Sequence, residues 1–412
     1  MKQLVLFICR ILFGLVFMFS GFVKAVDPLG SMYKFEDYFI AFGFTSLAPL
    51  TLFLAIALAA LEFLIGANLV LGVHIKKTSW LALFFMAFMT PFTLYIAIAN
   101  PVADCGCFGD AWIIDNWTTF YKNILFSILI ITIFIFRNEE KIHLANRTQW
   151  MMSGFAILFS VAVSVYGYMR LPIFDFRPYK IGANIIEGMT IPENAPQDEY
   201  LTTFIYEKEG KQKEFTLDNF PTGDSTWTFV KQQSVLISKG FRPAIHDFSI
   251  DYQGEDITDI VLEDSNYTFL VISSKLEDYS QCYSDKINKL YAYAQQNGYS
   301  FYCLTSSFGD AVENFRTLTG ANYPIAFSDE VTLKTIIRTN PGVLLVKNAT
   351  VYNKWHCANL PDFSAPIEDT VFIDVNYPHL WKTVVWLLLL FSIPVALIYV
   401  LDKKSTIHNK TN

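Results

Sequence analysis

Six long apolar runs constrain this chain of 412 residues more than any other feature. A transmembrane helix needs about 20 mostly apolar residues, and the overall composition is 53% hydrophobic. The runs lie at Leu4–Val26, Ala48–Val73, Ser79–Asn100, Phe120–Phe136, Trp150–Met169 and Leu380–Leu401. The first run is longer than a typical signal-peptide core and lacks a small-residue cleavage site, so we expect it to remain as a helix. The sequence therefore predicts a helical membrane protein with six spans.

The charges in the loops predict the orientation of these spans. Lysine and arginine gather in alternate loops, at Lys76, Lys77, Arg137, Lys141, Arg147, Lys403, Lys404 and Lys410. The other loops carry carboxylates, at Asp27, Glu36, Asp37, Asp104, Asp110 and Asp115. Positive charge stays on the cytoplasmic side, so both termini are predicted to be cytoplasmic and residues 171–378 to face outward. The formal charge of −7 argues against a nucleic-acid partner. The apolar runs indicate membrane lipid as a partner.

The outward segment has the pattern of a folded domain. Residues 171–239 are polar and β-rich, with a hairpin predicted through Glu209-Gly210-Lys211. From about residue 240 strands and helices alternate. Strands are predicted at Tyr267–Ser273, Ser300–Thr305, Gly342–Lys347 and Thr350–Trp355, and helices at Asp285–Asn297, Gly309–Leu318 and Glu330–Ile337. This alternation is typical of an α/β domain.

Two of the six cysteines, Cys105 and Cys107, stand one glycine apart just after the third apolar run. A disulfide between them would close a small strained ring, and strained disulfides are easily reduced. Gly106 and Gly109 permit the tight backbone that the ring needs. A redox pair is one interpretation. The others are structural packing and a metal site, although two ligands rarely hold zinc and no histidine lies nearby.

Arg10 and Glu62 are charged residues inside the first two apolar runs. Such residues usually face the bundle interior and pair. Arg10 lies about 9 Å and Glu62 about 16 Å from the inner ends of their helices, a difference that an arginine side chain can bridge. The pair would form a pocket for a quinone head group or a proton relay. Alternatively it is an ion pair that fixes helix register, or Arg10 extends toward the cytoplasmic surface. Lys24 is expected to be an interfacial anchor.

Residues 1–145 resemble the DoxX/MauE-like membrane family. The resemblance rests on the segment Arg10 to Lys24, which contains Gly14, Ser20 and Gly21, on the segment Leu61 to Gly66, and on Cys105-Gly106-Cys107-Phe108-Gly109. It implies a four-helix bundle in a bacterial inner membrane, with the fifth span at 146–170 and the last at 379–402 as additions.

Residues 240–370 resemble a periplasmic thioredoxin-like domain of the TlpA kind. The resemblance rests on an opening hairpin at 242–254 and on the segment Asn340 to Trp355, in which Pro341 stands as the cis-proline that borders a substrate groove. The family's first active-site cysteine is replaced by Tyr279, while Cys282 occupies the second position. Cys357 returns to the same end of the sheet, so either it pairs with Cys282 or the two thiols are unrelated. Cys303 lies within a strand and is expected to be a buried structural thiol.

These features support two functions. In the first, the protein is a thiol–disulfide redox protein in which Cys105 and Cys107 exchange electrons with quinone or with a periplasmic thiol protein, with Cys282 and Cys357 as a weaker second site. In the second, it is a non-enzymatic adaptor or assembly factor that binds a membrane-complex partner through a degenerate thioredoxin-like domain.

Overall fold

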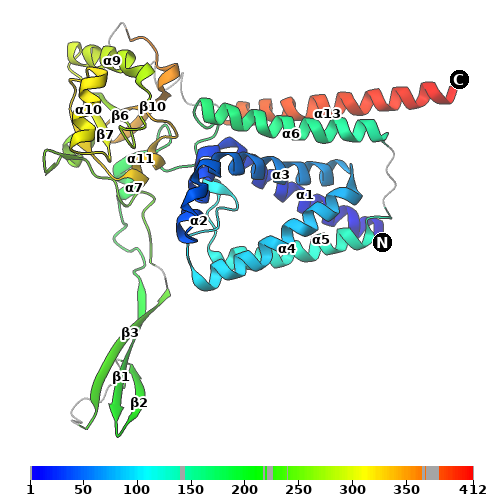
Figure 1. The fold of residues 1–412 in the computed structure, drawn as a ribbon, viewed down its shortest axis with the longest axis horizontal. Helices are drawn as coiled ribbons and strands as arrows, with labels where there is room; N and C mark the ends of the chain where they lie inside the picture. The colour runs from blue at the N-terminus through cyan, green and yellow to red at the C-terminus, as the bar shows by residue number, and fades with distance from the viewer. Residues whose placement is uncertain are drawn as a thin grey trace.

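A computed structural model of the chain describes residues 2–139, 144–216, 219, 226–238, 240–363, 367 and 380–411. Six of its helices are long and apolar enough to cross a membrane, which confirms the predicted helical membrane protein. They are α1 (Lys2–Val26), α3 (Thr51–Leu71), α4 (Ile75–Ala99), α5 (Asn116–Phe136), α6 (Asn146–Met169) and α13 (Leu380–Thr411). Both chain ends lie at one end of this bundle and the α/β domain at the other (Figure 1). Lys141 and the predicted domain boundary at 370–379 lie outside the described residues.

Helices α1 and α3 pack backbone to backbone because both carry glycine on their shared face. A Cβ at Gly66 would lie 2.3 Å from the backbone nitrogen of Met18, and one at Gly21 would lie 2.4 Å from that of Phe63. Small residues allow transmembrane helices to approach this closely. The turn of α1 around Gly21 also carries Lys24, so the close approach brings that lysine against α3.

A helix that the sequence analysis missed, α2 (Pro28–Ala41), lies across the end of the bundle next to the α/β domain (Figure 1). Asp27 is its N-cap, since its carboxylate accepts a hydrogen bond of 2.8 Å from the Gly30 amide. Pro28 fits the first helical position because that position needs no amide donor. The cap turns the chain sharply at the end of α1 and places α2 between the bundle and the domain.

The α/β domain is built on a seven-stranded sheet of order β10-β9-β6-β7-β8-β4-β5. The strands are β4 (Asp251–Tyr252), β5 (Glu255–Asp256), β6 (Thr268–Ile272), β7 (Ser300–Thr305), β8 (Ile325–Phe327), β9 (Gly342–Lys347) and β10 (Thr350–His356). Strands β6, β7 and β8 are parallel, whereas β9 is antiparallel to both β6 and β10. The helices are α7 (Ile185–Met189), α8 (Thr258–Leu262), α9 (Ser284–Gln296), α10 (Asp310–Thr319) and α11 (Glu330–Ile336).

Two local features of this domain agree with the predicted thioredoxin-like layout. The peptide bond between Asn340 and Pro341, directly before β9, is cis. Strands β9 and β10 then form the predicted return hairpin, with Asn348 and Ala349 at the turn. The opening hairpin was predicted at 242–254, but the paired strands are β4 at 251–252 and β5 at 255–256, so the hairpin is shorter and begins later.

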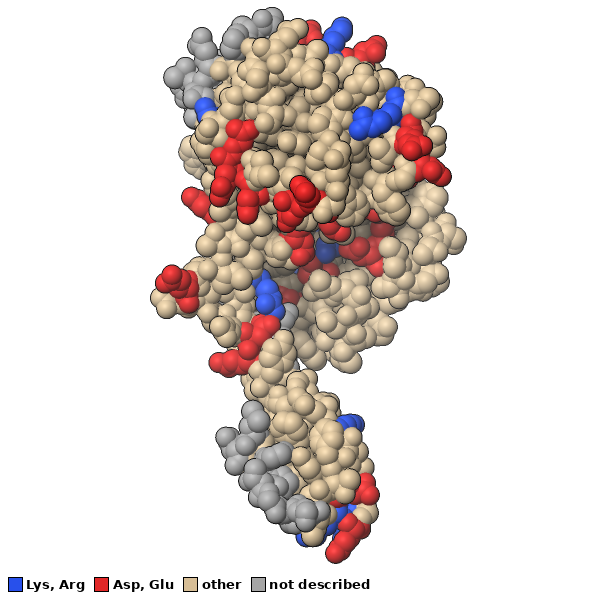
Figure 2. All heavy atoms as spheres, turned by 90° about the vertical axis from the view of Figure 1, so that its left-hand side faces the viewer, with Lys and Arg blue, Asp and Glu red and all other residues tan. Residues whose placement is uncertain are grey.

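A separate antiparallel sheet, β2-β1-β3, extends away from the α/β domain (Figure 1). Its strands are β1 (Glu199–Lys208), β2 (Lys211–Thr216) and β3 (Thr228–Ser238). The turn between β1 and β2 at Glu209 and Gly210 has φ values of +53° and +74°, so the predicted hairpin is confirmed. Seen from the domain end, Asp and Glu side chains gather over the α/β domain (Figure 2). An acidic face of this kind repels anionic partners.

Candidate functional site

Cys105 and Cys107 lie in the loop between α4 and α5 as free thiols, with their Sγ atoms 3.1 Å apart. Gly106 and Gly109 have φ values of +66° and +51°, which residues with a Cβ rarely adopt. The Gly109 amide donates a hydrogen bond of 3.1 Å to the Gly106 carbonyl and closes a tight turn. The two thiols therefore need to approach by only about 1 Å to reach the S–S bond length of about 2.05 Å.

Helix α2 holds the first half of this loop. The Lys34 Nζ atom lies 2.7 Å from a carboxylate oxygen of Asp104. The hydroxyl of Tyr38 donates a hydrogen bond of 3.0 Å to the carbonyl of Cys105. The same Asp104 also accepts a hydrogen bond of 2.8 Å from the Gly106 amide. These contacts fix the backbone on the Cys105 side of the pair.

Helices α1 and α3 place a buried ion pair beneath Cys107. The Nζ atom of Lys24 lies 2.7 Å from Oε2 of Glu62, and the two side chains are 6% and 7% exposed. The hydroxyl of Ser20 donates to the same Oε2 at 2.8 Å. Lys24 also donates a hydrogen bond to the Cys107 carbonyl. A buried charge pair persists only when its remaining hydrogen-bonding groups are satisfied, and here the network extends to the thiol loop.

The predicted pairing of Arg10 with Glu62 is wrong, because Glu62 pairs with Lys24. Arg10 instead donates from Nε to the carbonyl of Leu69 at 2.8 Å. The N-terminal part of α1 extends past the C-terminal end of α3. Arg10 therefore lies beside the last turn of α3, whose carbonyls lack helical partners. The expectation that Lys24 is an interfacial anchor is also wrong, since its side chain is buried against α3.

The surroundings of the two thiols separate their pKa values. The pKa of Cys107 is lowered to about 6, first by the hydrogen bond from Cys105 and then by the positive charges of Lys122 and Lys24, against the opposing effects of burial and Glu62. The pKa of Cys105 is raised well above its usual value, first by the hydrogen bond to Cys107 and then by burial. Near neutral pH, Cys107 is therefore the thiolate and Cys105 the thiol. The thiolate is the nucleophilic form of cysteine.

A cavity of about 370 Å³ opens beside the thiol pair. Its polar lining includes Lys24, Lys34, Glu62, Cys105 and Cys107. Its apolar wall is formed mainly by aromatic side chains from α2 and α4, at Phe35, Tyr38, Phe39, Phe42, Phe85, Phe88 and Phe92. This combination of an aromatic wall with a few polar groups at one end suits a flat, apolar ring that carries polar oxygens.

The second predicted thiol site is not assembled. Cys282 is exposed in a 3-10 turn (Gln281–Tyr283), whereas Cys357 is fully buried, and both are free. Burial raises the pKa of Cys357 to about 12, which makes it a poor nucleophile. A disulfide between Cys282 and Cys357 is absent because one side chain faces solvent and the other faces the core. Cys303 is fully buried in β7, as expected of a structural thiol.

Tyr279, which replaces the family's first active-site cysteine, belongs to the core of the domain. Its side chain is buried and its ring lies 4.8 Å from that of Phe315. The cis-proline loop is nevertheless open to a second cavity of about 640 Å³, which Asn340, Tyr283 and His356 line together with α2. The loop at Pro341 therefore borders a groove whose opposite wall is formed by α2.

The sequence analysis missed the residues that complete the thiol site, namely Ser20, Lys24, Tyr38 and Lys34. Two signals could have identified them. Ser20 and Lys24 are one helical turn apart on the glycine-bearing face of α1, and Asp27-Pro28 has the form of a helix start. The second signal would have placed Lys34 and Tyr38 one turn apart on one face of a new helix.

Comparisons with known proteins agree with this description of the membrane part. No curated protein matches the chain. A candidate protein disulfide isomerase from Bacteroides thetaiotaomicron, solved in solution, is 14% identical over 28% of this chain and 77% of that chain, with a TM-score of 0.24. That score is too low to support an argument, so the fold assignment rests on the strand order and the cis-proline. Residues 200–239 match a domain of unknown function, DUF8463. Residues 2–136, about a third of the chain, match the family of the methylamine utilisation protein MauE, so the unit that carries the thiol pair is MauE-like.

Proposed function

We propose that this protein is a membrane thiol–disulfide redox protein that passes electrons from client thiols through Cys105 and Cys107 to a lipid-soluble quinone. The observation that carries the proposal is the cavity: the thiol pair and the Lys24–Glu62 ion pair line one end of a pocket whose walls are aromatic. Its volume of about 370 Å³ lies within the range of small-molecule sites. A quinone ring fits with its oxygens near Lys24 and its tail among the phenylalanines.

The chemistry at the pair follows from its two protonation states. The Cys107 thiolate and the Cys105 thiol lose two electrons and form the S–S bond, and the quinone gains those electrons. The Cys105 proton goes to one quinone oxygen, and a second proton is taken up by the other oxygen through the Lys24–Ser20–Glu62 network. The products are the disulfide and the quinol, so atoms and charge balance.

The disulfide is then reduced by a client dithiol. A client thiolate attacks one sulfur to give a mixed disulfide, and the second client thiol releases the pair as a dithiol. The small ring strains the Cys105–Cys107 disulfide, and strained disulfides are the more oxidising ones. Electron flow from client to quinone is therefore the favoured direction. The loop and the α/β domain lie at the same end of the bundle (Figure 1), which under the positive-inside rule is the periplasmic side.

The test uses the purified full-length protein with its thiols reduced. Addition of a short-chain ubiquinone should oxidise the pair, as followed by maleimide mass-tagging, and should produce one quinol per disulfide. Cys105→Ser and Cys107→Ser should abolish the reaction, whereas Cys282→Ser should not change it. If both thiols stay reduced in the presence of excess quinone, the redox proposal fails. The degenerate site at Tyr279 would then favour the alternative of a membrane-anchored adaptor.

A further inference from the structure

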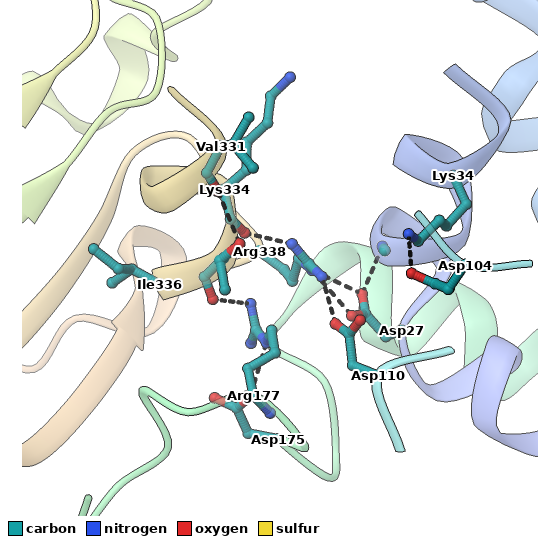
Figure 3. Close-up of polar contacts among 12 residues, drawn as sticks. Asp27, Lys34, Asp104, Asp110, Asp175, Arg177, Val331, Lys334, Ile336 and Arg338 are labelled. Carbon is teal, nitrogen blue, oxygen red and sulfur yellow. Dashed lines mark hydrogen bonds and ion pairs between the residues drawn. The ribbon is translucent and has the colours of Figure 1, made fainter. Parts of the chain in front are cut away.

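One arginine of the α/β domain reaches across to the thiol loop of the membrane bundle. Arg338 follows α11 and precedes the cis-proline loop by two residues. Its Nη2 atom lies 2.8 Å from Oδ2 of Asp110, and its Nε atom lies 2.9 Å from Oδ2 of Asp27 (Figure 3). The arginine side chain is only 6% exposed. It therefore joins the N-cap of α2, the loop that carries the thiols and the α/β domain at one buried point.

The contact with Asp110 lies on the side of the thiol loop that follows Cys107, where the bundle contacts the ring of Phe108 through Phe19 and Lys122. The part of the loop before Gly106 is tied to α2 through Asp104 and Cys105. The Cys107 carbonyl is held by α1. After Cys107 comes the buried ring of Phe108, then Gly109 at φ +51°, then Asp110. Among the described residues, Arg338 is the only ion-pair partner of Asp110.

We propose that Arg338 is a positioning residue of the Cys105/Cys107 centre. By holding Asp110 it keeps the turn after Cys107 closed and the two sulfurs in contact, so the reactivity of the thiols depends on the docked α/β domain. The proposal rests on the proposed redox role of the pair and adds a partner to it: the thiol centre is a composite of two domains. The α/β domain, which has no dithiol of its own, thereby controls the reactivity of the thiols in the bundle.

The experiment measures thiol reactivity in the reduced full-length protein, without quinone. The rate of Cys107 alkylation by iodoacetamide is followed from pH 4.5 to 9 by peptide mass mapping. The charged or titratable groups around Cys107 and its partner thiol are Lys24, Lys34, Glu62, Asp104, Lys122, Cys105 and Tyr38. None of them is changed in the variants. Asp110→Asn is the decisive variant, because it removes the charge through which Arg338 holds the loop while the Arg338–Asp27 pair can remain. Arg338→Gln breaks both contacts.

In the wild-type protein the alkylation midpoint should lie near pH 6. Asp110→Asn should move it upward by about one pH unit, which lowers the rate at pH 6 about fivefold. The direction of this shift separates a loop movement from a direct charge effect. Loss of a nearby carboxylate would by itself lower the pKa of a thiol, whereas the released loop should raise it. Arg338→Gln should shift the midpoint at least as far.

Arg177→Gln is the matched control. Arg177 lies in the same interface, where it binds Asp175 (Figure 3) and the Thr335 carbonyl, and within the described residues none of its hydrogen bonds or ion pairs involves the thiol loop. Its midpoint should equal that of the wild type. The proposal is overturned if Asp110→Asn keeps the wild-type midpoint or lowers it, or if Arg177→Gln shifts it as much. Failure of quinone reduction with the Asp110→Asn shift intact would overturn the proposed function alone.

Discussion

Among the described residues, Lys24 is the ion-pair partner of Glu62. Lys24 compensates the Glu62 carboxylate in a site where both side chains are more than nine-tenths buried. Removing one partner of such a pair typically costs about 3–5 kcal/mol because the other charge stays buried. We expect Lys24→Met to lower the stability of the protein in detergent by about 3 kcal/mol, measured by thermal unfolding.

The matched control for this prediction is the double variant Lys24→Met/Glu62→Gln, which removes both charges. It should recover most of the lost stability, since a neutral amide can keep the hydrogen bond from Ser20. If the double variant is as unstable as Lys24→Met alone, the loss comes from side-chain packing and the uncompensated charge is not its cause.

Tyr279 is a core residue of the α/β domain at the position where a thioredoxin-like pattern has its first cysteine. Its ring fills the space between the start of α9 and Phe315 in the core. Truncation of a buried aromatic residue costs about 3–5 kcal/mol. Tyr279→Ala should therefore destabilise the domain by this amount, whereas Tyr279→Phe should stay within about 1 kcal/mol. Chemical denaturation followed by near-UV circular dichroism measures both, and equal losses would contradict the packing role.

At the scale of elements, the thiol site depends on the close approach of α1 and α3. Gly66→Ala would place a Cβ 2.3 Å from the Met18 backbone nitrogen and force the helices apart. We expect a loss of about 1–3 kcal/mol together with a weaker Lys24–Glu62 contact. Gly154→Ala in α6 is the matched control, because a Cβ there meets no atom within 4 Å. Thermal unfolding should separate the two variants, and equal stability would show that α1 and α3 can move apart freely.

The elements that the sequence predicts are those whose signal is local. The length of each apolar run predicts the six spans. The alternation of strand and helix patterns predicts strands such as Ser300–Thr305, which the structure reproduces residue for residue. Helix α2 was missed because its 14 residues are too few to cross a membrane, although Phe35, Tyr38 and Phe39 recur at helical spacing. The partner of Glu62 was missed for a different reason. Which residues of two helices pair depends on the position of each helix along the bundle axis. The sequence of each helix alone does not give that relative position.

At the scale of the whole molecule, the cis-proline end of the α/β domain faces the bundle. A cluster of charges lies between them, in which the half-buried carboxylates of Asp27, Asp110 and Asp175 meet the buried Arg177 and Arg338 (Figure 3) and the buried Lys354. Its members come from segments more than 300 residues apart, so no sequence pattern could indicate it. The ion pairs across this interface make the docking of the domain sensitive to charge.

The acid response of this interface gives the last prediction. Burial by itself raises the pKa of Asp27, but the positive charges of Arg338 and Arg177 outweigh it, so the pKa lies below its usual 3.8. A carboxyl group whose pKa is lowered on folding contributes stability above its unfolded pKa and loses it as the pH falls through the folded value. Asp27→Asn keeps the helix cap, since asparagine caps as well as aspartate, and removes the charge together with the Oδ2 acceptor of the hydrogen bond from Arg338. Its melting temperature should therefore lie well below that of the wild type at pH 7, and the difference should shrink as the pH falls below about 3.8. A difference that stays constant from pH 7 to 2.5 would mean that the Asp27 charge does not hold the domain on the bundle.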